Sequence, residues 1–483
     1  MDRRRILGGF LGFLLAFMVF GDGPVGVFGN GVFKVQHKFL GRRRVDELRA
    51  HDALRHRRFL SDVDLRIGGK GTPTGTGLYF AQIGLGSPPK NYYVQVDTGS
   101  DILWVNCVTC QRCPKKSDIG IELTLFDPKG SSTAKYVTCD QSFCSSLYGG
   151  DIPGCTPVLP CQYSVSYGDG STSSGFYVTD IVQYSQVTGD HQTKPANASV
   201  TFGCGGQQSG DLGSSNEALD GILGFGQSNS SILSQLASAG KVKKVFSHCL
   251  DTTNGGGIFA MGHVVDPKVK TTPLVPDQPH YNVNLKSIEV GGAFLALPTD
   301  LFETGDKKGT IIDSGTTLAY LPETAYKLLM AAIFSYQPDL SFHTVQDFLC
   351  FRFFGSVDDG FPDVTFHFEN SLLLTVYPHD YLFENQDGTW CVGWQNSGVQ
   401  SRDGRDIALL GDLVLSNKLV IYDLEKQVIG WTEYNCSSSI KVQDDKSGAV
   451  YSVDSHNISS SSRLDNGLFT MLLLLTALLC CLM

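Results

Sequence analysis

The chain has 483 residues, of which 42% are hydrophobic, and it contains 54 glycines and 29 phenylalanines but no long helical repeat. This length allows about three units of roughly 150 residues, and the composition favours a β-rich globular protein with many turns. Residues 1–71 hold 14 Lys and Arg against 7 Asp and Glu, which leaves 24 basic and 41 acidic residues, a formal net charge of −17, in the rest of the chain. An acidic body of this kind argues against a nucleic-acid partner.

The first 71 residues have the pattern of a signal peptide and a propeptide. Three arginines at 3–5 precede an apolar run at 6–20 and small residues up to 31, so we expect residues 1–29 to be a signal peptide, with an N-terminal membrane anchor as the alternative. Residues 45–60 place apolar side chains near helical spacing beside a basic face. We therefore expect residues 30–71 to be a propeptide that covers an acidic cleft, with a solvated basic linker as the alternative.

Short strands separated by turns follow a Gly/Thr-rich boundary at 68–77. Apolar and β-branched runs between turn signals predict strands at 79–85, 92–97, 161–167, 176–184, 200–202, 281–290, 309–313, 364–368 and 420–431. The best helix signal is at 323–334, opened by Pro322. A break after Ser247 divides the strands into two sets, so we expect two β-rich lobes, at 72–247 and 248–436.

Each lobe has one strand that delivers a carboxylate onto a tight turn. The two turns are Asp97-Thr98-Gly99-Ser100 and, 216 residues later, Asp313-Ser314-Gly315-Thr316. Each lobe also has a later apolar–Gly element, at 221–224 and 409–412, which indicates a diverged duplication. Two carboxylates that meet between the lobes would share one proton, because both cannot be ionised comfortably at close range. The ionised one could then activate a water while the other donates to a carbonyl oxygen, as peptide hydrolysis requires.

These turns resemble the two motifs of the pepsin-like aspartic protease family. Trp104 stands seven residues after Asp97, and the sequence Tyr167-Gly168-Asp169-Gly170-Ser171 resembles the flap of that family. The resemblance implies that Asp97 and Asp313 are the catalytic pair. It also implies that Tyr167, Gly168 and Asp169 close over the substrate and that Tyr167 hydrogen-bonds toward Trp104.

The other motif residues suit supporting roles around the two carboxylates. Gly99 and Gly315 allow the close approach of two turns. Thr98 and Ser314 are able to hydrogen-bond across the interface, while Ser100 and Thr316 are able to orient the carboxylates.

Further stretches, at 77–80, 86–89, 246–250 and 428–431, are similar to the plant nucellin-like and nepenthesin-like branch of the family, and the resemblance covers about residues 75–436. It implies an all-β, bilobal pepsin-like fold with the active-site cleft between the lobes, in which each apolar–Gly element passes beneath its Asp turn. It further implies a monomeric aspartic endopeptidase that cleaves protein or peptide substrates at acidic pH without a metal or cofactor. The alternative is a non-catalytic binding or inhibitor-like module on the same scaffold, and a glycosidase with paired carboxylates has no support from the duplicated turn.

Cysteine usage indicates export. Apart from Cys480 and Cys481 in the tail, the chain has twelve cysteines, an even number that predicts a disulfide framework of open connectivity. These are Cys107, Cys110, Cys113, Cys139, Cys144, Cys155, Cys161, Cys204, Cys249, Cys350, Cys391 and Cys436. The spacing of the first three is also that of an iron–sulfur run, but an oxidising compartment favours disulfides. The sequence has neither His-Glu-x-x-His nor Gly-x-Ser-x-Gly, so metalloprotease and serine-hydrolase chemistry lack support.

Four Asn-x-Ser sequons predict glycosylation, at Asn197, Asn229, Asn435 and Asn457. The chain ends in a polar, Ser-rich spacer at 437–467 and an uncharged run at 468–483, which is shorter than the roughly 20 residues of a membrane-spanning helix. We therefore expect a glycolipid (GPI) anchor signal and a protein on the extracellular face of the plasma membrane. A short tail anchor, or a secreted, apoplastic protein, is the alternative.

Overall fold

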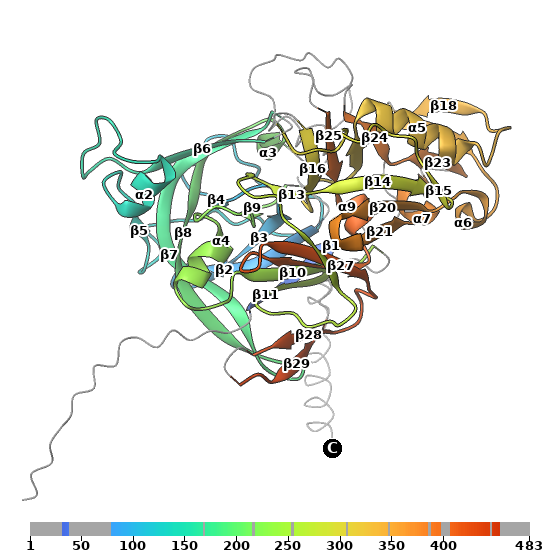
Figure 1. Cartoon of the computed structure of the whole chain (residues 1–483). Helices are drawn as coiled ribbons and strands as arrows, with labels where there is room; N and C mark the ends of the chain where they lie inside the picture. The colour runs from blue at the N-terminus through green and yellow to red at the C-terminus, as the bar shows by residue number, and fades with distance from the viewer. Residues whose placement is uncertain are drawn as a thin grey trace, which may run out of the picture.

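The computed structural model describes residues 31–37, 79–167, 170–214, 218–252, 256–305, 308–345, 348–384, 388–397, 406–444 and 447–454. These residues form two mainly β lobes with few and short helices, which confirms the predicted fold class (Figure 1). Several predictions fall outside the described residues: the signal peptide, the amphipathic segment 45–60, the flap residues Gly168 and Asp169, the sequon at Asn457 and the apolar tail.

The first lobe is built on long antiparallel strands and contains two short parallel pairings. Its strands are β2 (Tyr79–Leu85), β3 (Lys90–Asp97), β4 (Leu103–Asn106), β5 (Lys135–Tyr136), β6 (Gln162–Ser166), β7 (Thr172–Gly189), β8 (Gln192–Ser209) and β9 (Gly221–Gly224). Three short helices accompany them, α2 (Ser142–Leu147), α3 (Asp211–Ser214) and α4 (Ile232–Ser238). β7 and β8 form one hairpin with 18 residues in each strand, longer than predicted because their polar outer halves lack apolar alternation.

The second lobe repeats the plan in smaller sheets. One sheet has the order β13 (Tyr281–Val283), β16 (Lys308–Ile312), β25 (Asp406–Leu410), β17 (Ala319–Leu321) and β24 (Trp394–Asn396). The others contain β14 (Leu285–Val290), β15 (Ala293–Phe294), β20 (Val364–Phe368) and β21 (Leu373–Val376), and then β18 (Phe342–Val345), β19 (Phe348–Arg352), β22 (Leu382–Glu384) and β23 (Thr389–Val392). The main helix is α5 (Glu323–Phe334), with Pro322 at its N-cap, as predicted. The remaining helices are short: α6 (Val357–Gly360), α7 (Pro378–Tyr381), α9 (Asp412–Leu415) and the 3-10 turn η2 (Glu369–Ser371).

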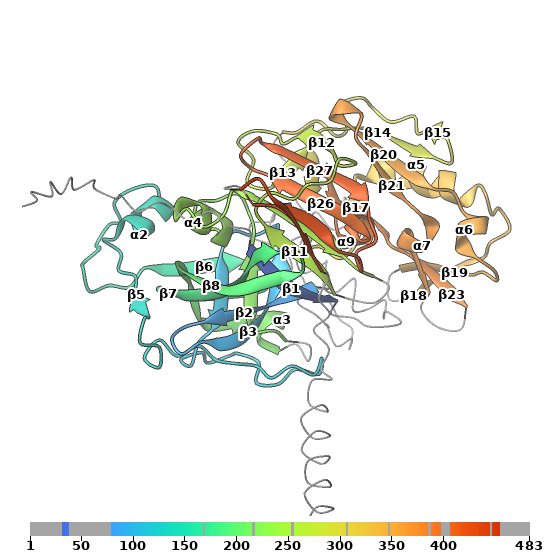
Figure 2. The same ribbon diagram turned by 90° about the horizontal axis from the view of Figure 1, so that it is seen from below.

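Strands from both halves of the chain meet in a central sheet. It runs in the order β12 (Lys270–Pro273), β27 (Val428–Glu433), β26 (Lys418–Asp423), β10 (Val245–Leu250), β11 (Gly257–Met261) and β1 (Gly31–His37), and then continues into β2 (Figure 2). Ser247, after which we expected the lobe boundary, lies inside β10. β1 comes from the expected propeptide, so part of that segment is a strand between β11 and β2.

A β-hairpin occupies the start of the expected polar spacer. Its strands are β28 (Ile440–Gln443) and β29 (Val450–Val453), at the foot of the molecule in Figure 1. Val442 and Val453 are buried against Val187 and Val264, and the backbone N–H of Val265 donates to the carbonyl of Lys441 at 2.8 Å. This part of the spacer therefore packs on the body of the protein.

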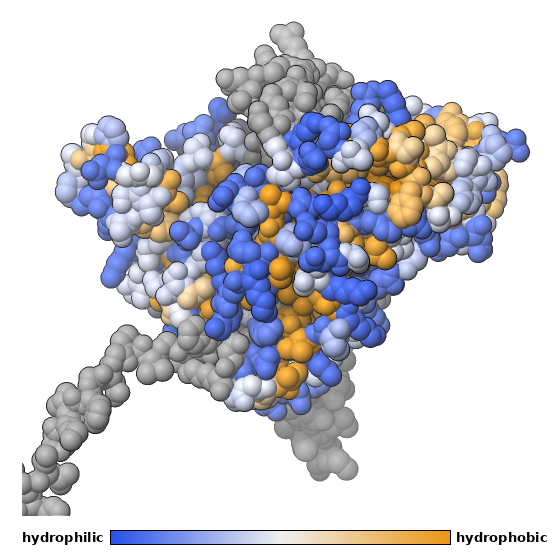
Figure 3. Space-filling model, in the orientation of Figure 1, coloured by the Kyte–Doolittle hydropathy of each residue, from blue (hydrophilic) through white to orange (hydrophobic). Residues whose placement is uncertain are grey.

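Large apolar side chains are exposed on both lobes, and one exposed apolar area lies on the second lobe. Figure 3 shows an apolar area at the upper right, over the region of α5 and β14, and the large exposed side chains of this lobe include Phe294, Tyr336 and Phe342. None of the helices in the described ranges has the length and apolar character needed to cross a membrane.

Candidate active site

The two Asp turns meet between the lobes. Asp97 ends β3, and Asp313 directly follows β16. A Cβ atom added to Gly99 would lie 2.7 Å from Asp313 Oδ2 and 2.9 Å from its Cγ, closer than real Cβ contacts. The Asp313 carboxylate therefore lies against the Asp97 turn, and only glycine at position 99 permits this approach.

Each carboxylate is held by a backbone N–H on one oxygen and by a hydroxyl on the other. The N–H groups of Gly99 and Gly315 donate to Oδ1 of Asp97 and of Asp313, both at 2.8 Å. The hydroxyls of Ser100 and Thr316 donate to the two Oδ2 atoms, the latter bond being 2.8 Å long. Hydrogen bonds on both oxygens fix the orientation of each carboxyl group, and Ser100 and Thr316 lie where the sequence predicted.

Thr98 and Ser314 connect the two turns, as expected. The backbone N–H of Ser314 donates to Thr98 Oγ1 at 2.9 Å, and the Ser314 hydroxyl lies 3.4 Å from the same atom. Thr98 Oγ1 is also 3.5 Å from Asp313 Oδ1. One threonine thus ties the first turn to both the backbone and the carboxylate of the second.

Two buried residues of the central sheet near Thr98 were not predicted from the sequence. The Tyr422 hydroxyl, from β26, shares a hydrogen bond with Thr98 and lies 3.2 Å from Nε2 of His248, from β10. Both side chains are fully buried, and burial lowers the pKa of His248 to about 3. A neutral histidine and a tyrosine of the central sheet therefore support the junction between the turns. His248 lies in the stretch 246–250 that resembles the plant branch, and Tyr422 lies in the predicted strand 420–431, but neither pattern marked them as site residues.

The apolar–Gly elements pass beneath the Asp turns, as predicted. β9 pairs parallel with β3 and antiparallel with β4, and β25 has the same relation to β16 and β17. Cβ atoms added to Gly224 and Gly411 would lie 2.7 Å from the Ser100 carbonyl oxygen and 2.4 Å from that of Thr316. The repeated geometry confirms the interpretation of a diverged duplication.

Tyr167, the predicted flap tyrosine, lies on the first lobe beside Trp104. Trp104 Nε1 donates to the Tyr167 hydroxyl at 2.5 Å, so the predicted hydrogen bond is present. The turn between β6 and β7 is closed by backbone bonds from Tyr167 to the Ser171 carbonyl and from Gly170 to the Tyr167 carbonyl. Tyr167, Trp104 and Ile222 share one buried cluster.

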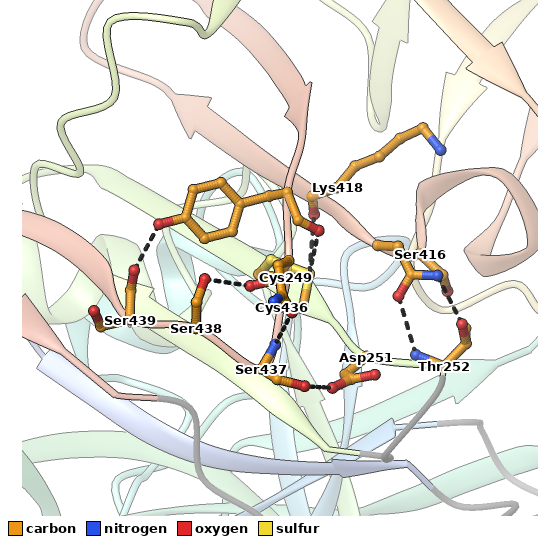
Figure 4. Close-up of a disulfide and its surroundings, with 12 residues drawn as sticks. Cys249, Asp251, Thr252, Ser416, Lys418, Cys436, Ser437, Ser438 and Ser439 are labelled. Atoms are coloured by element: carbon orange, nitrogen blue, oxygen red, sulfur yellow. Dashed lines mark hydrogen bonds between the residues drawn. A yellow bond between two sulfur atoms is a disulfide. The ribbon is translucent and has the colours of Figure 1, made fainter.

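All twelve predicted cysteines form disulfides. The pairs are Cys107–Cys204, Cys110–Cys113, Cys139–Cys155, Cys144–Cys161, Cys249–Cys436 and Cys350–Cys391. Figure 4 shows the pair Cys249–Cys436, which ties β10 to the segment after β27, beside a hydrogen bond from the Ser437 hydroxyl to Asp251. This disulfide joins residues 187 positions apart, which constrains the unfolded chain strongly.

The remaining predicted sites are described in part. Asn197, Asn229 and Asn435 are exposed, as glycan acceptors must be, and their modification stays a prediction. Within the ranges that the structure describes, no three His, Cys, Asp or Glu side chains are grouped as metal ligands.

Comparisons with known proteins agree with this architecture. Residues 79–263 match the family model "Xylanase inhibitor N-terminal", and residues 280–433 match "Xylanase inhibitor C-terminal". Among curated proteins, the chain is 54% identical to Aspartic proteinase 36 of Arabidopsis thaliana over 450 residues, 92% of each chain. It is 53% identical to Aspartic proteinase 39 of the same plant over 437 residues, 90% of each chain.

A solved structure is similar in fold. Conglutin gamma, a basic 7S globulin from lupine seeds, superposes with a TM-score of 0.61 at 20% identity, over 84% of this chain and 95% of that one. At this identity the similarity shows the fold alone.

Proposed function

This chain belongs to the plant pepsin-like aspartic protease family, and from that premise we propose that it is an endopeptidase that hydrolyses peptide bonds with Asp97 and Asp313. The observation that supports this most strongly is that the Asp313 carboxylate lies against Gly99 of the Asp97 turn, and that hydrogen bonds hold both oxygens of each carboxylate. Preorganised groups of this kind stabilise charge that develops during a reaction.

The proposed reaction uses one water and one shared proton, as is established for aspartic proteases. The ionised carboxylate takes a proton from the water, whose oxygen attacks the carbonyl carbon of the peptide bond. The protonated carboxyl group gives its proton to the carbonyl oxygen. The tetrahedral intermediate then collapses: the C–N bond breaks as the leaving amine takes a proton from one carboxyl group, and a hydroxyl of the intermediate returns its proton to the other carboxylate. The dyad regains its single proton, and no covalent enzyme intermediate forms.

The neighbouring residues have supporting roles in this proposal. Thr98 keeps the two turns in register through its bonds to Ser314 and Asp313. Tyr167 covers the bound peptide from the flap, and its bond to Trp104 sets its position.

The second candidate function is a non-catalytic binding module. The matched family models are named for xylanase inhibitors, and conglutin gamma is a seed globulin, so the scaffold also serves proteins that are not named for hydrolysis. The retention of both Asp turns with their hydrogen bonds favours the enzyme.

A peptide-cleavage assay between about pH 3 and 7 tests the proposal. We expect the full chain to cleave unstructured peptides and the Asp97→Asn variant, with an unchanged circular dichroism spectrum, to lose activity by at least about 10³-fold. Peptide binding without turnover by the wild-type chain would support the binding module instead.

We also propose that the protein acts in the secretory pathway or outside the cell, on protein or peptide substrates at acidic pH. Six disulfides suit an oxidising compartment. The glycolipid anchor is a separate proposal: a phosphatidylinositol-specific phospholipase should release the protein from membranes. If the protein stays bound with its tail attached, the anchor is excluded.

A further inference from the structure

Gln95 carries a buried side-chain amide that has no hydrogen-bond partner in the part of the chain that the structure describes. Its side chain is 1% exposed, and neither Nε2 nor Oε1 has a partner among the described residues. An amide carries two donors on nitrogen and an acceptor oxygen, and leaving such groups unpaired in the interior is costly. A ligand that binds next to Gln95 would supply the missing hydrogen bonds.

The strand geometry places Gln95 on the catalytic face of β3. Val94 and Val96 point into the main hydrophobic core. Side chains alternate along a strand, so Gln95 and Asp97 share the opposite face. Two residues of strand span about 7 Å, which is within reach of a substrate residue next to the bond that is cleaved.

Gln95 also lies in a row of residues beneath the flap. The strand registers pair Phe80 with Gln95, Gln95 with Ile222, and Ile222 with Trp104, across four adjacent strands. Paired residues in neighbouring strands point to the same face of a sheet. Because Trp104 is bonded to Tyr167 of the flap, and Ile222 packs in the same cluster as Tyr167, this row is the floor under the flap. Gln95 is its one polar member.

We propose that Gln95 is a specificity-determining residue that hydrogen-bonds an uncharged polar side chain of the substrate, an amide or a hydroxyl, within one or two residues of the scissile bond. This proposal rests on the proposed function. Such a side chain satisfies both the donor and the acceptor of Gln95. An apolar side chain leaves them unpaired, and a charged one is costly to desolvate in a floor that is otherwise apolar.

A peptide panel tests the preference directly. The peptides differ at a single position, on one side or the other of the scissile bond. The polar set carries Gln, Asn, Ser or Thr at that position, and the apolar set carries Leu or Met. For the full chain we expect kcat/KM to be about tenfold higher for the polar set at one position. The Gln95→Met variant should lose this preference, while Gln192→Met, the same change at the exposed first residue of β8, should keep it. A wild-type chain with no polar preference overturns the proposal, and so does a variant that loses activity equally on all peptides.

A binding measurement separates this proposal from the proposed function. Fluorescence anisotropy of the same labelled peptides with Asp97→Asn and with Asp97→Asn/Gln95→Met needs no turnover. If the wild-type chain cleaves no peptide, the endopeptidase proposal fails. If Asp97→Asn nevertheless binds the polar peptides about tenfold more tightly than the apolar peptides, and Asp97→Asn/Gln95→Met does not, the result would still support Gln95 as the residue that binds the polar side chain. Equal binding of both sets to Asp97→Asn overturns the assignment of Gln95.

Discussion

Replacing His248 with leucine should change how the stability of the protein depends on pH. His248 is fully buried in β10, its Nε2 lies 3.2 Å from the Tyr422 hydroxyl, and its Nδ1 has no partner among the described residues. Burial lowers its pKa to about 3, whereas a histidine in the unfolded chain titrates at about 6.5. Between these values the unfolded state binds one more proton, so this residue's contribution to the free energy of unfolding is full above pH 6.5 and is lost as the pH falls toward 3.

The magnitude follows from the two pKa values. One pH unit in this window corresponds to about 1.4 kcal/mol, so the loss at pH 4 is of the order of a few kcal/mol. At pH 7 the His248→Leu variant should be less stable than the wild type by about 1 kcal/mol, because the Tyr422 hydroxyl loses a partner. The variant lacks the titrating group, so the difference should shrink below about pH 6.5 and reverse sign near pH 5 to 6.

Urea unfolding of the full chain with its disulfides intact measures this difference. Tryptophan fluorescence at pH 7, 6, 5 and 4 gives the free energy of unfolding of both proteins, and other titrating groups cancel in the comparison. A difference between variant and wild type that is the same at all four pH values would refute the reasoning, because it would mean that His248 does not remain neutral in the folded protein.

Three further outcomes are expected. Burial raises the pKa of Asp220 to about 7, so its stabilising contribution is full below about pH 4 and lost as the pH rises through 7. As the pH rises from 4 to 7, Asp220→Asn should therefore become more stable relative to the wild type, a trend opposite to that of His248→Leu. A stability difference between the two proteins that does not change with pH would contradict this. Gly99→Ala places a methyl group 2.7 Å from Asp313 Oδ2 and should lower kcat by about 100-fold or more, since small displacements of catalytic groups have such effects; wild-type activity in a folded variant would exclude the close approach. Tyr167→Phe removes the hydrogen bond to Trp104 and should lower kcat/KM about tenfold and the free energy of unfolding by about 1 kcal/mol, because the buried Trp104 N–H loses this acceptor. An unchanged circular dichroism spectrum is the control for folding, and unchanged kinetics would contradict the prediction.

The sequence predicted the two Asp turns and their meeting because its signals are local. A strand that ends in Asp97 or Asp313 and continues into a hydroxyl–Gly–hydroxyl turn needs no distant contact to be recognised, and its duplication implied the meeting of two lobes. The helix Glu323–Phe334 was predicted with correct bounds for the same reason, since Pro322 marks its start.

The features that sequence did not predict depend on distant partners. β28 contributes only Ile440 and Val442 to a buried cluster that Val187 and Val264 complete, so its polar and small neighbours indicated a spacer. Disulfide connectivity and the pairing of β1 with β11 also depend on segments far apart in the chain. The sequence predicts the face of the strand on which Gln95 lies, because Gln95 is two residues before Asp97. Its lack of a hydrogen-bond partner among the described residues is visible only in the three-dimensional structure.

Hydrolysis of an unstructured peptide by the wild-type chain, Asp97→Asn and Asp313→Asn, compared side by side at acidic pH, tests the central claim most directly. We predict turnover by the wild type and a loss of at least about 10³-fold in each folded variant. Cleavage by either folded variant at the wild-type rate would show that the two carboxylates do not perform the reaction.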